Sequence, residues 1–308
     1  MRTRPPRVRQ QRPREMPPPR PEASRSSAGG GPSPAAVRRS THAPLLEVFT
    51  SIQGEGLFVG QPQDFLRLAG CPLRCDWCDT RGSWGLPPRA PSADESVSGA
   101  DLRTAAWITP LDAAARVQRL AGELHDRRRP LSITGGEPLI WPDFIAALLP
   151  LLGERPVHLE TAGAHPAALA TLVDRLAHVS LDLKLPADLA PPITTELGTG
   201  PEAPPADAES WSAARLACLE LLAGRPACAK LPVAAGRQAA DFEELLLDLE
   251  ASAPQLPLFI QPVNGIGGNG ERLRGPRPEL LMELAERGEE LGLTVRVVPQ
   301  IHPVIGLD

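Results

Sequence analysis

The chain has 308 residues, of which 42% are hydrophobic, enough for one large domain or two small ones with a buried core. It contains no run of about 18 apolar residues and no apolar segment behind its basic N-terminus, which excludes a membrane-spanning helix and argues against a secretory signal. The net charge is −5, although residues 1–43 hold ten arginines and only two acidic residues, so the rest of the chain is acidic and does not resemble a nucleic-acid-binding domain.

Residues 1–43 are rich in Pro, Arg and Ser, and we expect a disordered extension because such a segment buries too little apolar surface to offset its ordering entropy. A contact with an anionic partner, an organelle transit peptide and a start codon placed too far upstream remain alternatives. Residues 44–308 are predicted to form one domain. A cytoplasmic, reducing location is the expectation, and there clustered cysteines indicate metal binding or catalysis more often than disulfides.

Strand and helix patterns alternate after the extension, beginning with the short apolar run QDFLRLAG. Helices are predicted at 111–126, with Thr109 placed to cap it and Pro110 in its first turn, and at 141–152, 165–177, 210–224, 241–252 and 277–292. Strands are predicted at 63–70, 131–136, 156–161, 179–184, 228–233, 257–263 and 294–299.

This alternation predicts an α/β fold, an open, partial (β/α) barrel of about six parallel strands, with a doubly wound sheet as the alternative. In either fold, ligands bind at the carboxyl ends of the strands. Residues 81–109 and 186–209 are predicted to be loops, and no role is assigned to them.

Three of the five cysteines lie together in the stretch GCPLRCDWCDT, directly after the first predicted strand. Cys71, Cys75 and Cys78 could bind three irons of a four-iron cluster, which leaves the fourth iron open to a small ligand. A zinc site remains an alternative, although it would need a fourth ligand. Cys218, within a predicted helix, and Cys228, at the start of a strand, are predicted to be small core residues.

The C-x3-C-x2-C spacing, with Trp77 before the last cysteine, resembles the signature of radical S-adenosylmethionine (SAM) enzymes. That resemblance implies a [4Fe-4S] cluster whose open iron is chelated by the amine and carboxylate of SAM. The stretch ITGGEP follows one βα unit later, and its turn, Gly135-Gly136-Glu137-Pro138, is implied to receive the methionine amino group.

The stretches SIQGEG (51–56), FLRLAGC (65–71) and CDT (78–80) resemble, more narrowly, the 7-carboxy-7-deazaguanine synthase family. LETAG, LDLKLP, IQPVNG and PQIHPVIG match more weakly but in the same order. The resemblance implies a lyase that converts 6-carboxy-5,6,7,8-tetrahydropterin to 7-carboxy-7-deazaguanine and releases ammonia, on the route to 7-deazapurines such as queuosine. It also implies a flavodoxin or ferredoxin as electron donor, and a homodimer.

By the same resemblance, Thr80 would bind Mg2+ with support from Asp79, and Arg67 would hold the substrate carboxylate. The other residues implied to contact substrate are Ile52, Gln53, Gly54, Glu55, Thr134, His302 and Asp308.

The residues implied to bind SAM include Asp182-Leu183-Lys184, where the family often has Ser-Pro-Lys; only Lys184 matches that motif. The others are Trp77, Cys78, Asp79, Gly135, Gly136, Glu137, Glu160, Gln261, Pro262, Val263 and Asn264. A glycyl-radical enzyme activase, which shares the cysteine loop and GGEP, remains an alternative function, as does a non-catalytic iron–sulfur or zinc module.

Overall fold

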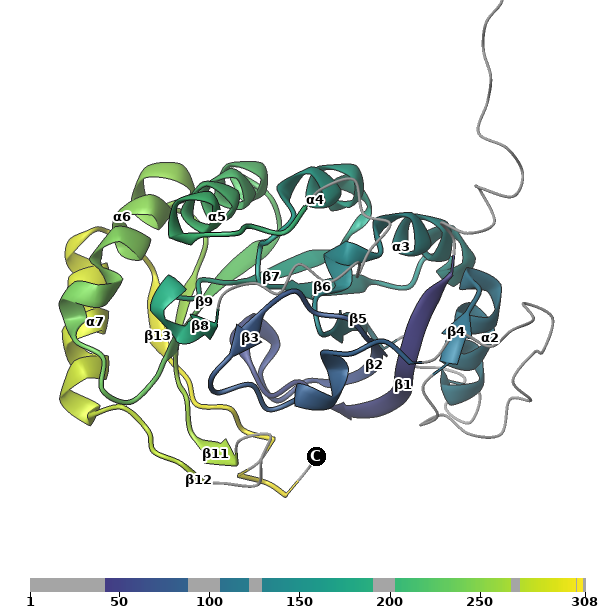
Figure 1. Cartoon of the computed structure of the whole chain (residues 1–308), viewed down its shortest axis with the longest axis horizontal. Coiled ribbons are helices and arrows are strands. Elements are labelled where there is room, and N and C mark those ends of the chain that lie inside the picture. Colours follow the sequence, from purple (N-terminus) through teal and green to yellow (C-terminus); the bar gives the residue numbers. More distant parts are fainter. Residues whose placement is uncertain are drawn as a thin grey trace, which may run out of the picture.

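The computed structural model describes residues 42–87, 106–121, 129–190, 203–266, 272–302 and 304–306. Its centre is a curved sheet whose strands run in the order β13-β10-β9-β7-β6-β5-β2-β1-β4 (Figure 1). The strands are β1 (Ala43–Ile52), β2 (Pro62–Leu68), β4 (Ala106–Ile108), β5 (Leu131–Gly135), β6 (Val157–Thr161), β7 (His178–Asp182), β9 (Ala227–Val233), β10 (Leu258–Pro262) and β13 (Val295–Val297). Two short antiparallel pairs lie outside it: β3 (Arg74–Cys75) with β8 (Leu189–Ala190), and β11 (Gly265–Ile266) with β12 (Arg272–Leu273).

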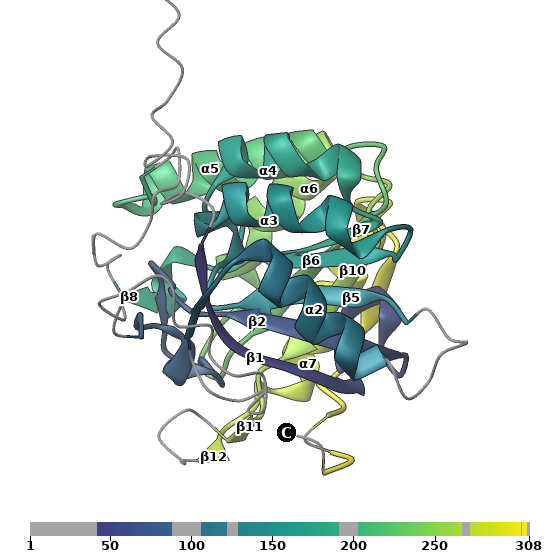
Figure 2. The ribbon, with the colours of Figure 1, turned by 90° about the vertical axis from the view of Figure 1, so that its right-hand side faces the viewer.

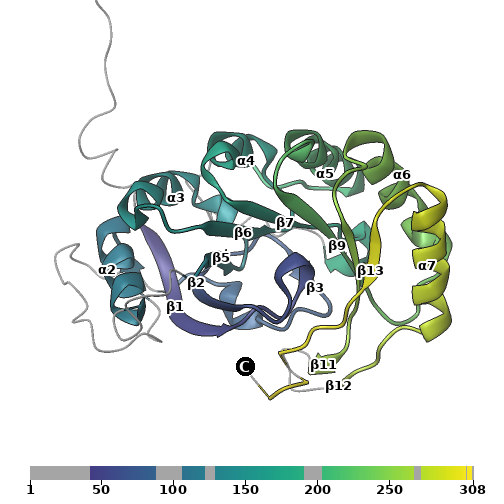
Figure 3. The same ribbon diagram turned by 180° about the vertical axis from the view of Figure 1, so that it is seen from behind.

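The helices form an arc around the convex side of the sheet (Figure 3). They are α2 (Pro110–Ala121), α3 (Pro142–Leu148), α4 (Pro166–Leu172), α5 (Ala208–Leu222), α6 (Glu243–Ser252) and α7 (Pro278–Glu290). Short 3₁₀ turns are η1 (Gly56–Phe58), η2 (Arg81–Ser83), η3 (Pro138–Ile140), η4 (Leu149–Leu152), η5 (Val173–Arg175), η6 (Pro186–Asp188) and η7 (Ala239–Phe242). In the part of the chain that the structure describes, no helix is both long and apolar enough to cross a membrane.

The predicted partial barrel is confirmed. In the large sheet, neighbouring strands pair in parallel along the order β2-β5-β6-β7-β9-β10-β13. Among the described residues, no hydrogen-bonded ladder joins β4 to β13 to close the barrel. The predicted strands and helices are present within a few residues of their expected bounds, except that the expected end of the first helix, 122–126, lies outside the described residues. The helices predicted at 141–152 and 165–177 end as the 3₁₀ turns η4 and η5. The first helix begins as expected, because the Asp112 N–H donates to Thr109 Oγ1 at 3.1 Å.

The antiparallel strands were not predicted. β1 lies between β2 and β4 in the sheet and is antiparallel to both; in Figure 2 it faces the viewer beside α2. Of the loops predicted at 81–109 and 186–209, residues 88–105 and 191–202 lie outside the described residues. The first assignment is wrong at its end, where β4 pairs with Ala43–Leu45, because three residues are too few to show a period. The second contains η6 and β8, and α5 begins within it at Ala208. The predicted extension, residues 1–43, lies outside the described residues except for its last two.

The two faces of the parallel sheet differ in polarity because side chains alternate along a strand. Leu181 on β7 and Leu231 on β9 are fully buried in the apolar core under the helices. Their neighbours Asp182 and Lys230 point to the inner, concave face, where they pair with each other. The curvature of the sheet therefore gathers polar side chains from many strands at its inner face.

Candidate functional site

The cysteine loop follows β2 and is held by its own main chain. The Gly70 N–H donates to the Ser83 carbonyl at 2.8 Å, and Arg74 Nη1 donates to the carbonyls of Cys71 and Leu73, each at 2.7 Å. Cys71 and Cys75 are buried and Cys78 is half-buried, and all three pack in one apolar cluster with Trp211. The predicted core residues Cys218 and Cys228 are fully buried elsewhere, as expected.

The environment of the three thiols fits an iron–sulfur cluster. Burial raises the pKa of Cys71 to about 12 and that of Cys75 to about 11, so these thiols need a cationic group beside them to ionise. Among the described residues, no three His, Cys, Asp or Glu side chains are placed to hold one metal ion. A four-iron cluster does not require such convergence, since each thiolate binds a different iron. The donor set therefore fits a cluster better than a single zinc ion.

The GGEP turn packs directly against the cysteine loop. The Gly136 N–H donates to the Leu68 carbonyl at 3.0 Å, and the Glu137 N–H donates to the Gly70 carbonyl at 2.8 Å. A Cβ at Gly136 would lie 2.3 Å from the Gly70 oxygen and 2.8 Å from the Cys71 Cβ. Glycine is thus required because two backbones touch here, which is a protein contact and does not depend on a ligand.

The Glu137 carboxylate is buried, and the protein itself supplies its hydrogen-bond partners. It accepts from Leu139 N at 3.0 Å, from Ala162 N at 2.9 Å and from Thr161 Oγ1 at 2.7 Å. Burial raises the pKa of Glu137, and these three donors oppose that rise. The side chain therefore anchors the turn to the end of β6, and the turn's main-chain groups are what it can offer to a ligand.

Lys184 links the cysteine loop to the end of β7. Its Nζ lies 5.1 Å from the centroid of the Trp77 ring and forms an ion pair with Asp182, while Trp211 Nε1 donates to its carbonyl at 3.0 Å. The indole N–H of Trp77 is buried and has no hydrogen-bond partner among the described residues. Leu183 is fully buried in the helix-side core, so only its main chain can take the predicted cofactor contact.

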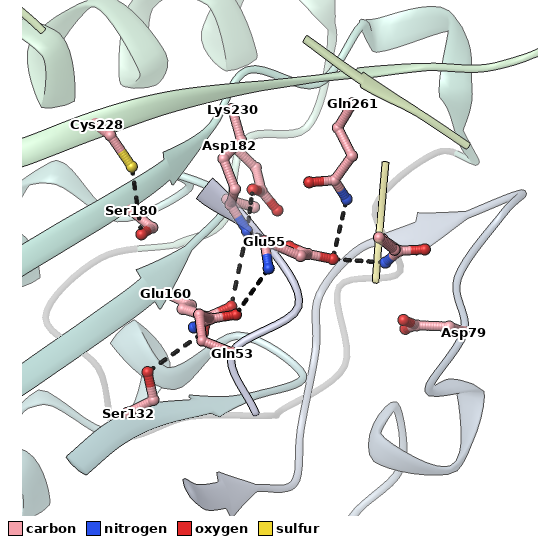
Figure 4. Close-up of polar contacts among 12 residues, drawn as sticks. Gln53, Glu55, Asp79, Ser132, Glu160, Ser180, Asp182, Cys228, Lys230 and Gln261 are labelled. Carbon is pink, nitrogen blue, oxygen red and sulfur yellow. Dashed lines mark hydrogen bonds and ion pairs between the residues drawn. The ribbon is translucent and has the colours of Figure 1, made fainter. Parts of the chain in front are cut away.

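A network of charged side chains centred on Lys230 lies on the inner face of the barrel (Figure 4). The ammonium of Lys230 lies 2.6 Å from Glu55 Oε2, 3.0 Å from Asp182 Oδ1 and 3.7 Å from Glu160 Oε2. Burial by itself would lower the pKa of Lys230, but attraction to Asp182, Glu55 and Glu160 raises it well above its ordinary value. Lys230 is therefore a cation shared by three carboxylates.

The carboxylates in this network have further partners. Glu55 Oε1 accepts from Gln261 Nε2 at 2.9 Å and from Gln300 Nε2 at 2.5 Å. Glu160 Oε1 accepts from Gln53 Nε2 at 2.8 Å and from Ser132 Oγ at 3.3 Å. Burial alone would raise the pKa of Glu55, but attraction to Lys230 brings that pKa below its ordinary value.

Burial alone would raise the pKa of Asp182, but attraction to Lys184 and Lys230 holds that pKa at about 2. The carboxylates of Glu55 and Asp182 are therefore ionised at neutral pH. Gln53 is buried, and its side chain is used within the protein, since its Oε1 also accepts from the Glu55 N–H at 3.1 Å.

A second polar group lies between β2 and the cysteine loop. Arg67 Nη1 approaches Thr80 Oγ1 at 3.5 Å, and the Thr80 hydroxyl donates to Asp79 at 2.6 Å. Arg67 Nε donates to Glu47 at 2.8 Å, and Arg67 pairs in register with Thr134 on β5. In Figure 4 the Asp79 carboxylate points from the cysteine loop toward the Lys230 network.

The C-terminal segment covers the turn after β1. The Ile301 N–H donates to the Gly54 carbonyl at 3.1 Å, and a Cβ on Gly54 would lie 2.2 Å from His302 Nδ1. The structure thus brings Gly54 and His302 together, whereas Asp308 lies outside the described residues. The other predicted site residues follow strand ends: Ile52 is half-buried, Pro262 and Val263 are buried, and Asn264 is exposed.

Several residues of this site were not predicted from the sequence. Lys230 is the most prominent, and one signal was available: it is a lone charge in the otherwise uncharged predicted strand CAKLPV. No local signal marks the others, which are Ser132, Thr161, Trp211 and Gln300. Their roles depend on partners from distant elements.

The chain is similar in sequence to several known proteins. Residues 66–197 match the radical SAM superfamily. The chain is 32% identical over 274 residues to the 7-carboxy-7-deazaguanine synthase of Geobacter sulfurreducens, covering 86% of this chain and 97% of that protein. It is also 32% identical over 267 residues to the 7-carboxy-7-deazaguanine synthase of Methanothermobacter thermautotrophicus, covering 86% of this chain and 98% of that protein. Among solved structures, QueE from Escherichia coli aligns with a TM-score of 0.49 at 21% identity, covering 83% of this chain and 93% of that one.

Proposed function

Because the chain belongs to the 7-carboxy-7-deazaguanine synthase family of radical SAM enzymes, we propose how its own residues hold the cluster, the cofactor and the pterin substrate. The reaction converts 6-carboxy-5,6,7,8-tetrahydropterin to 7-carboxy-7-deazaguanine and releases ammonia, a step of 7-deazapurine biosynthesis. Neither alternative function, the activase or the non-catalytic module, matches these relatives. The observation that carries the proposal is the meeting of the three-cysteine loop with two polar groups, the Arg67–Thr80 pair and the Lys230 network.

Cys71, Cys75 and Cys78 would hold the [4Fe-4S] cluster, and SAM would occupy the space between that loop and the ends of the neighbouring strands. When bound, cluster and SAM supply the electron and the radical that removes a hydrogen atom from the substrate. The support from this chain is that Gly135 and Gly136 are half-buried beside the cysteine loop, and that the buried indole N–H of Trp77 has no hydrogen-bond partner among the described residues.

Other cofactor contacts would come from the ends of strands β6, β7 and β10. The supporting observation is that Lys184, at the end of β7, packs on Trp77 within the cysteine loop. The contributing residues would be Glu160, Asp182, the main chain of Leu183, Lys184, Gln261, Pro262, Val263 and Asn264. Glu137 would act by anchoring its turn.

For the substrate, Arg67 would bind the carboxylate through the edge of its guanidinium that Glu47 does not occupy. Glu55 would accept from a ring N–H, because a guanine-like edge presents donors to a carboxylate. Thr134 lies beside Arg67 across the strand pair and would contact the same molecule. Ile52, the main chain of Gln53 and Gly54, and His302 would line the ring from the turn after β1 and from the C-terminal segment.

A magnesium ion would bind at Thr80. Mg2+ prefers oxygen ligands and keeps several waters, so a hydroxyl and the adjacent Asp79 carboxylate suit it. Arg67 lies close enough to Thr80 that one substrate carboxylate could contact both the ion and the guanidinium. The ion would then help to fix the substrate's position, which a radical reaction requires if side reactions are to be avoided.

Three further properties belong to the proposal. A flavodoxin or ferredoxin would reduce the cluster, because a four-iron cluster accepts one electron at a low potential. A homodimer is consistent with β13, an edge strand on which Val297 is 40% exposed. A reducing cytoplasm suits free thiols that must bind iron.

The test is anaerobic reconstitution with iron and sulfide, followed by turnover of 6-carboxy-5,6,7,8-tetrahydropterin with SAM and dithionite. We expect a brown protein, with 7-carboxy-7-deazaguanine and ammonia formed in equal amounts. Cleavage of SAM without formation of 7-carboxy-7-deazaguanine would contradict the proposal. A reconstituted protein that holds zinc and no cluster would also contradict it. Sedimentation analysis under the same conditions tests the dimer.

A further inference from the structure

Lys230 has no assigned role in binding substrate or cofactor, yet it forms ion pairs with three carboxylates on the inner face. Its side chain is 4% exposed, and its ion-pair partners come from the turn after β1, from β6 and from β7. A buried ammonium is costly to desolvate unless carboxylates surround it, and here they do. The question is what this arrangement does for the reaction.

Glu55 is the partner that Lys230 approaches most closely and the one proposed to bind substrate. A carboxylate has about four acceptor positions. The described residues fill three of them: Oε1 accepts from Gln261 and Gln300, and Oε2 accepts from Lys230. One position on Oε2 is left for a ligand, and the side chain is 17% exposed, so a ligand can reach it.

We propose that Lys230 is a positioning residue for the pterin: its ion pair fixes the Glu55 rotamer in which Oε2 accepts from one ring N–H. This inference rests on the proposed function, in which Glu55 is the substrate acceptor. Gln261 and Gln300 hold the other oxygen but carry no charge, so they can orient the carboxylate without keeping it ionised.

Other charged groups also face this pair. Asp182 and Glu160 contact the same ammonium, and Lys184 pairs with Asp182. On the same two strands as Asp182 and Lys230, His178 and Cys228 contact each other at 3.4 Å. Without the ammonium, Glu55 would be a buried carboxylate near Asp182, and both burial and repulsion would raise its pKa. A protonated Glu55 offers the ring N–H a much weaker acceptor.

The first experiment compares reconstituted wild type with Lys230→Met, Glu55→Gln and the double variant. We expect each single variant to lower kcat/KM for the pterin by about 10- to 100-fold, mainly through KM, as for loss of a charged hydrogen bond. We expect the double variant to be no worse than Glu55→Gln, since Lys230 acts through that carboxylate. For Lys230→Met, kcat/KM rises with pH as Glu55 ionises, whereas wild type and the double variant stay flat over the same range.

The outcomes separate the two proposals. If Glu55→Gln leaves KM unchanged, Glu55 is not the substrate acceptor and both proposals about it are wrong. If Glu55→Gln raises KM while Lys230→Met leaves it unchanged, only the role of Lys230 is overturned. The role is also overturned if the effects of the two single variants add, or if KM rises for SAM and not for the pterin, because Lys230 would then act through Asp182.

Two further variants serve as controls. Arg215→Met removes a different buried cation, which pairs with Glu244 and Asp248 outside the barrel, and should lower stability without changing KM or the pH profile. If Lys230→Met does not fold, Glu55→Asp keeps the charge but shortens the reach to Lys230. It should raise KM at least tenfold, and a wild-type KM with a flat pH profile in that variant would overturn the proposal.

Discussion

Replacing Gly136 by alanine tests whether the cluster site depends on the contact between the GGEP turn and the cysteine loop. The new methyl group would lie 2.3 Å from the Gly70 oxygen, whereas ordinary contacts of this kind are about 3.3 Å or longer. The turn must therefore move away by about 1 Å, and this movement strains two main-chain hydrogen bonds, Gly136 to Leu68 and Glu137 to Gly70.

The cost follows from those contacts. Overpacking costs about 1–3 kcal/mol, and the two weakened hydrogen bonds cost about 0.5–1.5 kcal/mol each, so we expect a loss of about 2–6 kcal/mol. With an unfolding entropy of about 2.1 cal/mol/K per residue over residues 44–308, that corresponds to a fall of about 4–11 °C in the melting temperature of the apo protein. Since Cys71 is the nearest side chain to the clash, the variant should also bind less than the full complement of about four irons.

The assay is thermal melting of the apo protein, together with iron and sulfide content after anaerobic reconstitution. Gly82→Ala is the matched control, since Gly82 lies in the same region, has ordinary backbone angles and has open space where a Cβ would be. It should melt and reconstitute like wild type. A Gly136→Ala protein that melts at the wild-type temperature and holds a full cluster would refute the argument from close backbone contact.

Three other predictions concern separate parts of the molecule. Thr80→Ala should abolish the stimulation of turnover by Mg2+ and leave the iron content unchanged, whereas Thr80→Ser should retain the stimulation. An alanine variant with unaltered Mg2+ dependence would exclude the metal role. Arg67→Lys should raise KM for the pterin about 10- to 100-fold with little change in kcat, because an ammonium cannot form the bidentate fork; a wild-type KM would contradict this. Burial lowers the pKa of His158 to about 4, so between pH 6.5 and 4 the unfolded chain binds more protons and the free energy of unfolding falls as pH falls. His158→Gln should weaken this dependence by up to about 1.4 kcal/mol per pH unit in apo-protein melts, and an identical slope in the variant would show that the histidine is not responsible.

Local patterns in the sequence were sufficient for the parallel strands, their helices and the cysteine loop, but not for the antiparallel strands β1 and β4. The alternation of strand and helix signals determines a parallel sheet, and the spacing of Cys71, Cys75 and Cys78 on one loop determines which thiols can share a cluster. These features depend on residues a few positions apart, where chain geometry alone limits what can meet. The strand β4 was missed for the corresponding reason: Ala106–Ile108 is too short to have a period, and it forms only because β1 is there to pair with it.

The Lys230 network was decided only by the tertiary structure. Glu55 lies 175 residues from Lys230, 206 from Gln261 and 245 from Gln300, so no window of sequence contains the group. Nor do sequence patterns distinguish a Glu137 that binds a ligand from one that anchors its own turn, as the structure shows it does. The physical reason is that hydrogen bonds and ion pairs act over about 3–4 Å. Which distant side chains come that close depends on the register and curvature of the whole sheet.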